Sequence, residues 1–358
     1  MINSVQLKNF GPLTEIDWQD LGPINLVIGN NGCGKSFLLK AIYSAVRTLE
    51  DYKRGDNPED ASDILFNKLY WTFQTEKIGD LVSKQSDASL YFGLMIDKLA
   101  FNYSFGKDTS KAINSVENNV TPRESNSIFL PAKEVISIHQ IILETRERGK
   151  RFGFDDTYFD LAKALTITEL EGFINNFEKT GVTISEHQSP AKGYGSKEFE
   201  ESRNKLELLL DGKIEYDKTS SRWYFKKGRQ RFSIGITAEG IKKIAILDTL
   251  LGNGQLDKDS IVFIDEPESN LHPKAISDFL DIIALLAQQG LQFFLASHSY
   301  AVVKKLYLIA QQQQVSISVL SKEGDDWVQS DLLDDFPDNP IIDESIRLYE
   351  QEVELAFK

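Results

Sequence analysis

Residues 29–36 read Gly-Asn-Asn-Gly-Cys-Gly-Lys-Ser, and this octapeptide sets the class of fold. It matches the pattern G-x-x-x-x-G-K-[ST] in full. Its glycines let the backbone wrap closely, so that several N–H groups point at the oxygens of one phosphate. The apolar run Leu21–Ile28 predicts a strand, and apolar residues at helical spacing in Lys35–Leu49 predict a helix whose N-terminal end favours an anion. The sequence therefore predicts a phosphate-binding loop between a buried strand and an amphipathic helix.

This loop predicts both a nucleotide and a metal ion. Lys35 is expected to reach the β- and γ-phosphates, and the Ser36 hydroxyl is expected to ligate Mg²⁺. Cys33 occupies a variable position of the pattern, and we interpret it as a small side chain that points away from phosphate, not as a redox centre. The predicted nucleotide-binding residues are Asn30, Asn31, Gly32, Cys33, Gly34, Lys35, Ser36 and Phe37.

A second cluster, Ile261–Glu266, has four apolar residues followed by two acids. Such a run is typical of a buried parallel strand, and ligands bind at the carboxyl edge of the strands in open α/β sheets. Asp265 is then expected to hold Mg²⁺ through water, and Glu266 to polarise the attacking water. The alternative is an acidic pair that caps the next helix. The residues that follow, Pro267–Pro273 and an amphipathic helix, argue against that alternative.

A third element is the strand predicted at Leu291–Ala296, which leads into Ser297, His298 and Ser299. A histidine at the end of a core strand can hydrogen-bond either a γ-phosphate or the attacking water. Its place after the two earlier elements favours such a role over a structural one. His272, beside the acidic turn, is expected to be structural or to lie at a dimer contact.

Composition narrows the class of protein. The 358 residues include 54 Asp and Glu against 40 Lys and Arg, for a net charge of -14, which argues against a protein that coats nucleic acid with its whole surface. A single cysteine excludes an intramolecular disulfide and a cysteine zinc cage. No apolar run approaches the roughly 18 residues of a membrane span, and the N-terminus has no signal-peptide pattern. We therefore expect a cytoplasmic protein without a membrane partner.

The order of predicted elements is that of an α/β protein. Strands and helices alternate over residues 260–320, which predicts a mostly parallel sheet with helices on its faces. Further strands are expected at Ile2–Lys8, Leu69–Phe73, Ala88–Ile96 and Lys98–Phe105, a loop at 106–127, and a last helix at 341–358. We expect three parts: residues 1–132 with the phosphate loop, 133–232 with a helical insertion and a small antiparallel β meander, and 233–358 with the second and third clusters.

Together these elements resemble the ATP-binding-cassette ATPase superfamily in its non-transport branch, which includes the SMC, double-strand-break-repair and OLD (overcoming lysogenization defect) ATPases. The run DEPESNLHP at residues 265–273 is the most specific motif of this likeness, and LKNFGPL near the N-terminus is also similar. The resemblance implies a P-loop ATPase that uses ATP and Mg²⁺, with Walker A at Gly29–Ser36 and Walker B at Ile261–Glu266. It also implies catalytic roles for Glu266 and His298, a D-loop that contains Ser269 and Asn270, and a metal-side Q-loop glutamine, for which Gln74 is the candidate.

The family's signature helix departs from its pattern here. The resemblance implies a Ser-Gly pair that contacts the γ-phosphate held by a partner protomer. Gly240 fits, but Glu239 stands where the serine is expected, unless the hydroxyl is displaced to Thr237. An acid would repel a triphosphate unless a cation or Lys242 compensates. Alternatively, Glu239 points away as an acid at the N-terminus of a helix, where the dipole favours it.

The resemblance implies two cassettes around two nucleotides, so we expect a homodimer or a heteromer that closes with ATP and reopens on hydrolysis. Residues 321–358 are too few for the nuclease domain of OLD proteins, so a separate nuclease or toxin is the expected effector, in a nucleotide-driven switch of antiphage defence. One alternative is a DNA-binding repair ATPase that uses basic groups around Arg146–Arg151 and Lys226–Arg231. Another is a nucleotide-binding scaffold that does not hydrolyse ATP. For the basic groups, a partner protein or an ordinary solvated face are further interpretations.

Overall fold

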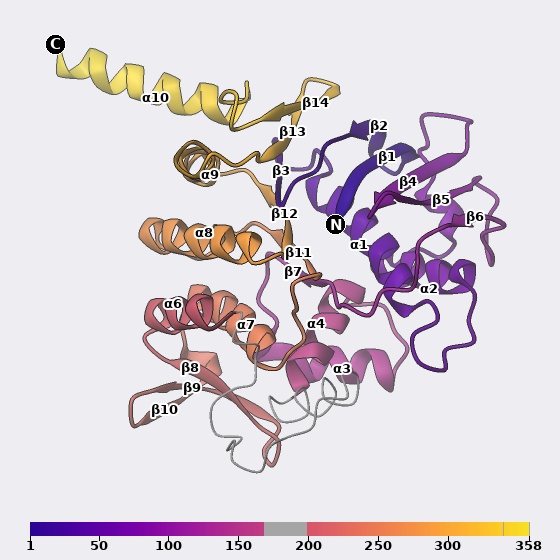
Figure 1. The fold of residues 1–358 in the computed structure, drawn as a ribbon, viewed down its shortest axis with the longest axis horizontal. Helices are drawn as coiled ribbons and strands as arrows, with labels where there is room; N and C mark the ends of the chain where they lie inside the picture. The colour runs from indigo at the N-terminus through magenta and orange to yellow at the C-terminus, as the bar shows by residue number, and fades with distance from the viewer. Residues whose placement is uncertain (168–198, 339, 358) are drawn as a thin grey trace. The chain divides into compact units, whose positions relative to one another are not determined.

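The structure is a computed structural model that describes residues 1–167, 199–338 and 340–357 (Figure 1). It divides into two compact units. The first unit contains Met1–Glu124, Phe263–Glu268 and Gln292–Lys358, and the second contains Ser125–Val262 and Ser269–Leu291. The predicted division at residues 132 and 232 stays a prediction.

The first unit is built around parallel strands. Strand β3 (Ile24–Ile28) lies between β12 (Gln292–Ser297) and β13 (Ser318–Glu323) and is parallel to both. Beyond β12 comes β11 (Ile261–Asp265), and β14 (Asp326–Asp331) pairs with the other side of β13 and is antiparallel to it. Every residue of β3 and β12 is buried, which is why their sequences read as continuous apolar runs. The predicted α/β fold with a mostly parallel sheet is confirmed.

Helix α1 (Lys35–Asp51) starts directly after the glycine-rich loop and packs on this sheet. Its Tyr43 ring meets the edge of Phe263 with centroids 5.7 Å apart, and Phe263 stacks on Phe294 at 5.2 Å. These contacts fix the helix against β11 and β12. The first turn of α1 is thereby held near the carboxyl ends of the strands.

A second, antiparallel sheet also belongs to the first unit. Its order is β2-β1-β4-β5-β6, with bounds Leu13–Trp18, Ile2–Phe10, Leu90–Ile96, Leu99–Phe105 and Ser115–Asn118 respectively. The sequence predicts β1, β4 and β5 but not β2 or β6, and β6 lies within the stretch expected to be a loop. Strand β6 is four residues long, has no buried residue and pairs along one edge of β5, so it has no apolar signal of its own.

The strand predicted at Leu69–Phe73 is wrong, because these residues end helix α2 (Ala61–Phe73). Aromatic residues favour strands on average, but tertiary burial overrides that preference here. The buried residues of α2 follow helical spacing from the start of the segment: Ala61, Ile64, Leu65, Leu69 and Thr72. The first unit also contains the short 3₁₀ turn Ile78–Leu81, helix α9 (Tyr300–Gln313), strand β14 (Asp326–Asp331) and helix α10 (Pro340–Ala356).

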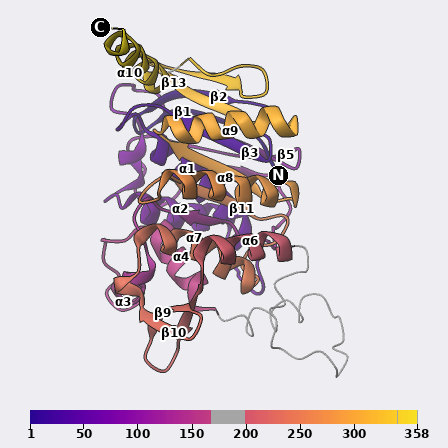
Figure 2. The ribbon, with the colours of Figure 1, turned by 90° about the vertical axis from the view of Figure 1, so that its left-hand side faces the viewer.

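The second unit is mainly helical, as expected for much of its length. Its helices are α3 (His139–Glu147), α4 (Asp156–Thr166), α6 (Glu200–Leu210), α7 (Glu239–Gly252) and α8 (Pro273–Gln288). Helix α6 packs against both α7 and α8 (Figure 2). The meander is confirmed as β8 (Lys213–Asp217), β9 (Arg222–Lys227) and β10 (Gln230–Ser233), and β7 spans Ile128–Leu130. The expectations of helix up to Asn176 and of a flexible stretch at 180–196 lie outside the described residues.

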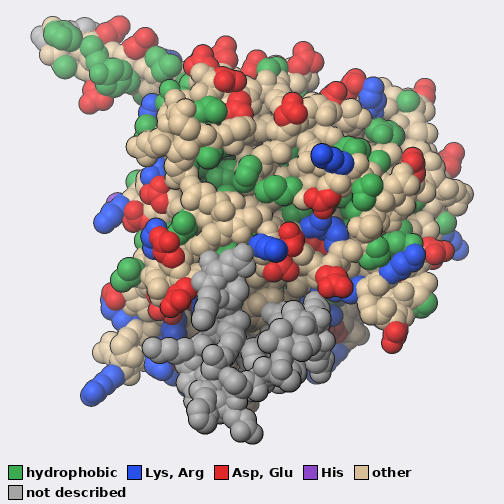
Figure 3. All heavy atoms as spheres, in the orientation of Figure 1, with side chains coloured by type: hydrophobic (Ala, Val, Ile, Leu, Met, Phe, Trp, Pro, Cys, Tyr) green, Lys and Arg blue, Asp and Glu red, His purple; other side chains and the backbone are tan. Residues whose placement is uncertain are grey.

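Helix α10 carries apolar side chains on its surface, visible at the upper left of Figure 3. Ile346, Leu348 and Tyr349 are all exposed, and Ile342 is buried. This helix therefore adds less to the core of the first unit than α1 does. None of the described helices is long and apolar enough to cross a membrane.

Candidate functional site

The glycine-rich loop has the backbone that its sequence predicts. Gly29, Gly32 and Gly34 all have positive φ angles, at 153°, 79° and 105°. A Cβ atom at Gly29 would lie 2.8 Å from the Cys33 sulfur, and one at Gly34 would lie 2.7 Å from the Leu13 side chain. At Gly29 and Gly34, glycine is required by both conformation and space. The Cys33 sulfur thus lies close to Gly29.

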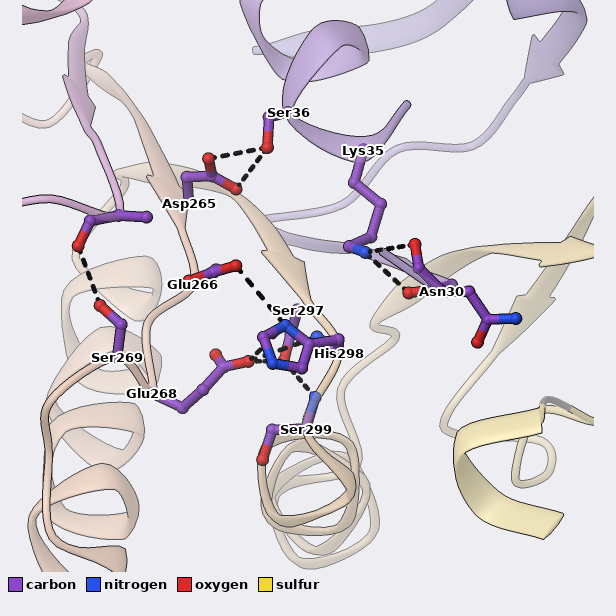
Figure 4. A network of polar contacts seen from close by, with 12 residues as sticks. Asn30, Lys35, Ser36, Asp265, Glu266, Glu268, Ser269, Ser297, His298 and Ser299 are labelled. Carbon is purple, nitrogen blue, oxygen red and sulfur yellow. Dashed lines mark hydrogen bonds and ion pairs between the residues drawn. The ribbon is translucent and has the colours of Figure 1, made fainter. Parts of the chain in front are cut away.

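Lys35 lies across this loop and is largely buried. Its Nζ donates hydrogen bonds to the carbonyl oxygens of Gly29 at 2.7 Å and Asn30 at 3.0 Å (Figure 4). An ammonium group has three donors, so these two bonds leave one for an anion. The loop therefore presents a positive charge at the positive end of α1, which fits a phosphate group.

Ser36 joins the loop to the end of β11. Its hydroxyl lies 2.9 Å and 2.7 Å from the two carboxylate oxygens of Asp265 (Figure 4). The two residues are 229 positions apart in the chain. A hydroxyl and a carboxylate are hard oxygen ligands of the kind that Mg²⁺ prefers, so this pair fits the predicted ion.

Gln74 follows the end of α2 and not the end of a strand. It is the C-terminal cap of the helix, with a left-handed φ of 52°. The preceding ring, Phe73, lies 4.6 Å from the ring of Phe37, which itself follows Ser36. Gln74 thus lies one residue from a contact with the first turn of α1, and its role at the metal stays a prediction.

Glu266 and His298 come together at the ends of β11 and β12. Glu266 has a left-handed φ of 49°, and its N–H donates to the Ala296 carbonyl at 2.9 Å. Its Oε1 lies 3.6 Å from Nδ1 of His298 (Figure 4). A non-glycine residue in this conformation stores strain, which is typical of functional sites. The carboxylate is held beside the histidine and one residue from Asp265.

Comparison with known proteins gives the family and the fold of the chain. Residues 24–304 match the family model described as "AAA domain, putative AbiEii toxin, Type IV TA system". The chain belongs to this AAA-domain family. Two solved SMC head structures share the fold, one titled as bound to the C-winged helix domain of ScpA and one titled as bound to the C-terminal domain of ScpA derived from Pyrococcus furiosus. The first is 13% identical with a TM-score of 0.55 over 92% of this chain and 97% of that chain, and the second is 12% identical with a TM-score of 0.50 over 98% of each.

Sequence reasoning missed one residue of this AAA-domain site, Glu268. Its side chain is 10% exposed, and its Oε1 accepts hydrogen bonds from the Ser297 hydroxyl at 2.8 Å and the His298 N–H at 3.3 Å. Oε1 also lies 3.6 Å from Nδ1 of His298. Oε2 is buried and has no hydrogen-bond partner among the described residues. The available signal was the second acid of Asp-Glu-Pro-Glu, which the sequence analysis quotes without giving it a role.

The residues predicted to form the signature helix and the D-loop of the AAA-domain protein meet within the second unit. A Cβ at Gly240 would lie 2.6 Å from the Asn270 carbonyl oxygen, so the start of α7 touches the D-loop backbone. Lys243 Nζ donates to the Ser269 hydroxyl at 3.2 Å, and that hydroxyl donates to the Ala132 carbonyl at 2.9 Å. The structure therefore joins two elements that the sequence places about thirty residues apart.

Glu239 is half exposed at the start of α7, and Lys242 lies close to it. Lys242 Nζ is 3.5 Å from Glu239 Oε1, 3.1 Å from Glu134 Oε1 and 2.9 Å from the Ser137 hydroxyl. Lys242 is thus shared between two carboxylates, of which that of Glu134 is the closer.

Two other residues lie outside these contacts. Thr237 bonds to the Ser233 carbonyl at 3.5 Å and not to the D-loop. His272 caps α8, since its Nδ1 accepts from the Lys274 N–H at 3.3 Å, in line with the structural alternative.

Proposed function

We propose that the chain is a cytoplasmic ATPase that binds ATP with Mg²⁺ and uses its hydrolysis to switch a partner effector. One observation carries the proposal: the Ser36 hydroxyl lies within hydrogen-bond distance of both oxygens of Asp265. A Walker A hydroxyl and a Walker B carboxylate at this distance can share one metal ion. The membership of an AAA-domain family and the SMC-head fold support the same activity.

Each group of residues in the site has a separate proposed role. The loop amides and Lys35 bind the phosphates, and Ser36 and Asp265, with Gln74 as the further candidate, hold the metal. Magnesium would supply charge neutralisation for the phosphate oxygens. Glu266 accepts a proton from the attacking water, and His298, which lies 3.6 Å from the Glu266 carboxylate, orients the reacting groups.

We further propose that the signature helix and D-loop act on the nucleotide of a second copy in an OLD-like homodimer, or on that of a related chain in a heteromer. Their mutual contacts support this, since Gly240, Ser269 and Asn270 are held together as one surface. A separate nuclease or toxin is the proposed effector, in antiphage defence. The family description, which names a toxin of a type IV TA system, is in keeping with such a role.

The DNA-binding alternative receives less support. Lys226 lies 3.3 Å from Glu215, and Arg231 lies 3.5 Å from Asp217 and over the ring of Tyr224. Lys226 and Arg231 thus each have an acidic partner in their own sheet, as on an ordinary solvated face, although residues 211–233 hold seven basic residues against three acidic ones. The non-hydrolysing scaffold is the other alternative, because Glu239 of the signature helix shares the nearby cation, Lys242, with Glu134.

The test of the proposal is calorimetric titration of the full chain with ATP and Mg²⁺. We expect binding by the wild type, and a loss of affinity of about 100-fold or more for Lys35→Ala, because the buried positive charge and its remaining charge-assisted contact to phosphate disappear. Lys8→Ala is the matched control, since Lys8 is an exposed lysine of the same unit that pairs with Glu15. If folded wild-type protein gave no heat of binding, the proposal would be wrong.

A further inference from the structure

Glu268 connects two strand ends that the proposed reaction uses. It lies two residues after Glu266, beyond Pro267, and its Oε1 accepts from Ser297 and from the N–H of His298 (Figure 4). The Ser297 hydroxyl accepts in turn from the Ser299 N–H at 3.0 Å. The turn that carries His298 is therefore attached to a single carboxylate oxygen.

The same carboxylate faces the ring of His298. Nδ1 lies 3.6 Å from Oε1 of Glu268 and 3.6 Å from Oε1 of Glu266. Ionised carboxylates only accept hydrogen bonds, so an imidazole between them is stabilised when Nδ1 carries the proton. Glu268 is also nine-tenths buried, and among the described residues His298 supplies the one basic group within 4.0 Å of it. A buried carboxylate needs such a partner.

We propose that Glu268 is a positioning residue that fixes the His298 backbone and holds the ring with N–H at Nδ1 toward the carboxylates. Nε2 is then the nitrogen available to the reacting groups. In a neutral ring Nε2 can only accept a hydrogen bond, which suits the attacking water and not a phosphate oxygen. In a protonated ring Nε2 donates, which suits phosphate. The kinetic consequence of this arrangement rests on the proposed ATPase function, but the ring geometry does not.

The first experiment uses no nucleotide. The chain has four histidines, so ¹⁵N spectra of histidine-labelled protein can be assigned to His298 by comparison with His298→Ala. We expect signals of an Nδ1-protonated ring, neutral or cationic, and a shift toward the Nε2-protonated tautomer in Glu268→Gln. Glu50→Gln is the matched control, because Glu50 is a buried acid of the same unit that pairs with Arg47 at 2.7 Å. A wild-type ring protonated at Nε2 alone, or no change in Glu268→Gln, would overturn the inference.

The second experiment is a double-mutant cycle on ATP hydrolysis. Glu268→Gln should lower kcat about tenfold with little change in KM, the loss usual when a supporting partner of a histidine is removed. In a His298→Ala background the same change should lower kcat by less than about twofold, because Glu268 acts through His298. Equal effects in both backgrounds would refute positioning.

Two further results distinguish a failure of this inference from a misfolded variant and from a failure of the proposed function. If Glu268→Gln fails to fold, Ser297→Ala takes its place in both experiments, since it removes one bond to Glu268 and keeps both acids. In that variant we expect a smaller effect in the same direction, and its absence would count against the inference. If folded wild-type protein hydrolyses no ATP, the proposed function fails while the spectra still decide the role of Glu268.

Discussion

The phosphate loop with the β11 end, in the first unit, and the signature helix with the D-loop, in the second, are built in different ways. In the first region the functional side chains lie at the carboxyl ends of parallel strands, and strand register places them. In the second region a helix start and a turn are joined by side-chain bonds, such as Lys243 to Ser269. The first region has a loop, a hydroxyl and three acids in one unit of one chain. In the second region the residues contact one another and, under the proposed function, act on the nucleotide of another copy of the chain.

This difference predicts that substitutions in the two regions affect different properties of the protein. Changes in the first region should abolish binding or chemistry in every assembly state. Changes in the second should leave nucleotide affinity intact and affect the rate of the assembled protein.

The largest effect is expected from Glu266→Gln. The amide cannot accept the proton of the attacking water, so kcat should fall by about 10² to 10⁴, the usual contribution of a general base. ATP affinity should stay within about threefold, since this group acts in the chemical step. Steady-state phosphate release measures the first quantity and calorimetry the second.

Glu15→Gln, at an exposed acid that pairs with Lys8, serves as the control for Glu266→Gln. Light scattering should also detect an ATP-dependent dimer that persists in Glu266→Gln. Equal turnover in wild type and Glu266→Gln would contradict the assignment of the base. A trapped nucleotide on a monomer would instead contradict the assembly part of the proposal.

A smaller effect is expected from Gly240→Ala in the second region. The new methyl group would lie 2.6 Å from the Asn270 carbonyl, so the D-loop must shift away from α7. Overpacking of this kind costs about 1–3 kcal/mol of the free energy of unfolding. We expect kcat to fall about tenfold, as for other supporting contacts, while ATP affinity of the single chain changes less than about twofold.

Gly235→Ala is the matched control for Gly240→Ala, because its Cβ would meet only the Ser233 hydroxyl, at 3.9 Å. It should leave both kcat and ATP affinity near the wild-type values. If Gly240→Ala weakened ATP binding as strongly as Lys35→Ala does, the separation between the two regions would not hold.

The sequence predicts the first region far better than the second. The meeting of Ser36 and Asp265 follows from a general rule, since the carboxyl ends of the parallel strands of one sheet share one edge. The bonds of Glu268 could not be predicted, because they depend on how close the ends of β11 and β12 come, across 29 and 30 positions of the chain. The same holds for Lys243 and Ser269, whose contact depends on tertiary packing.

The helices and strands that the sequence did not predict correctly have a related cause. At Leu69–Phe73 a short aromatic window favoured a strand, whereas burial over the whole of α2 selected a helix. Strand β6 is completed by its neighbour β5 and not by an apolar pattern of its own. Strand β2 buries Leu13, Ile16 and Trp18, a spacing that does not alternate strictly. Contiguous motifs thus predict a site well when one element supplies each part. They predict poorly the residues that support the site from the side.

The smallest effect lies in the second unit, away from the signature helix residues that the proposal uses. His139 is 3% exposed and meets the edges of Tyr216 and Trp223, with ring centroids 5.2 Å and 5.8 Å away. Burial lowers the pKa of His139, so the unfolded chain binds a proton there more readily than the folded chain does. The free energy of unfolding should therefore fall as the pH drops below about 6.5 toward the lower pKa of the folded state. Denaturant titrations at several pH values measure this slope, and His139→Phe, which keeps an aromatic ring and cannot titrate, should reduce it. An identical slope in the variant would assign the pH dependence to other groups.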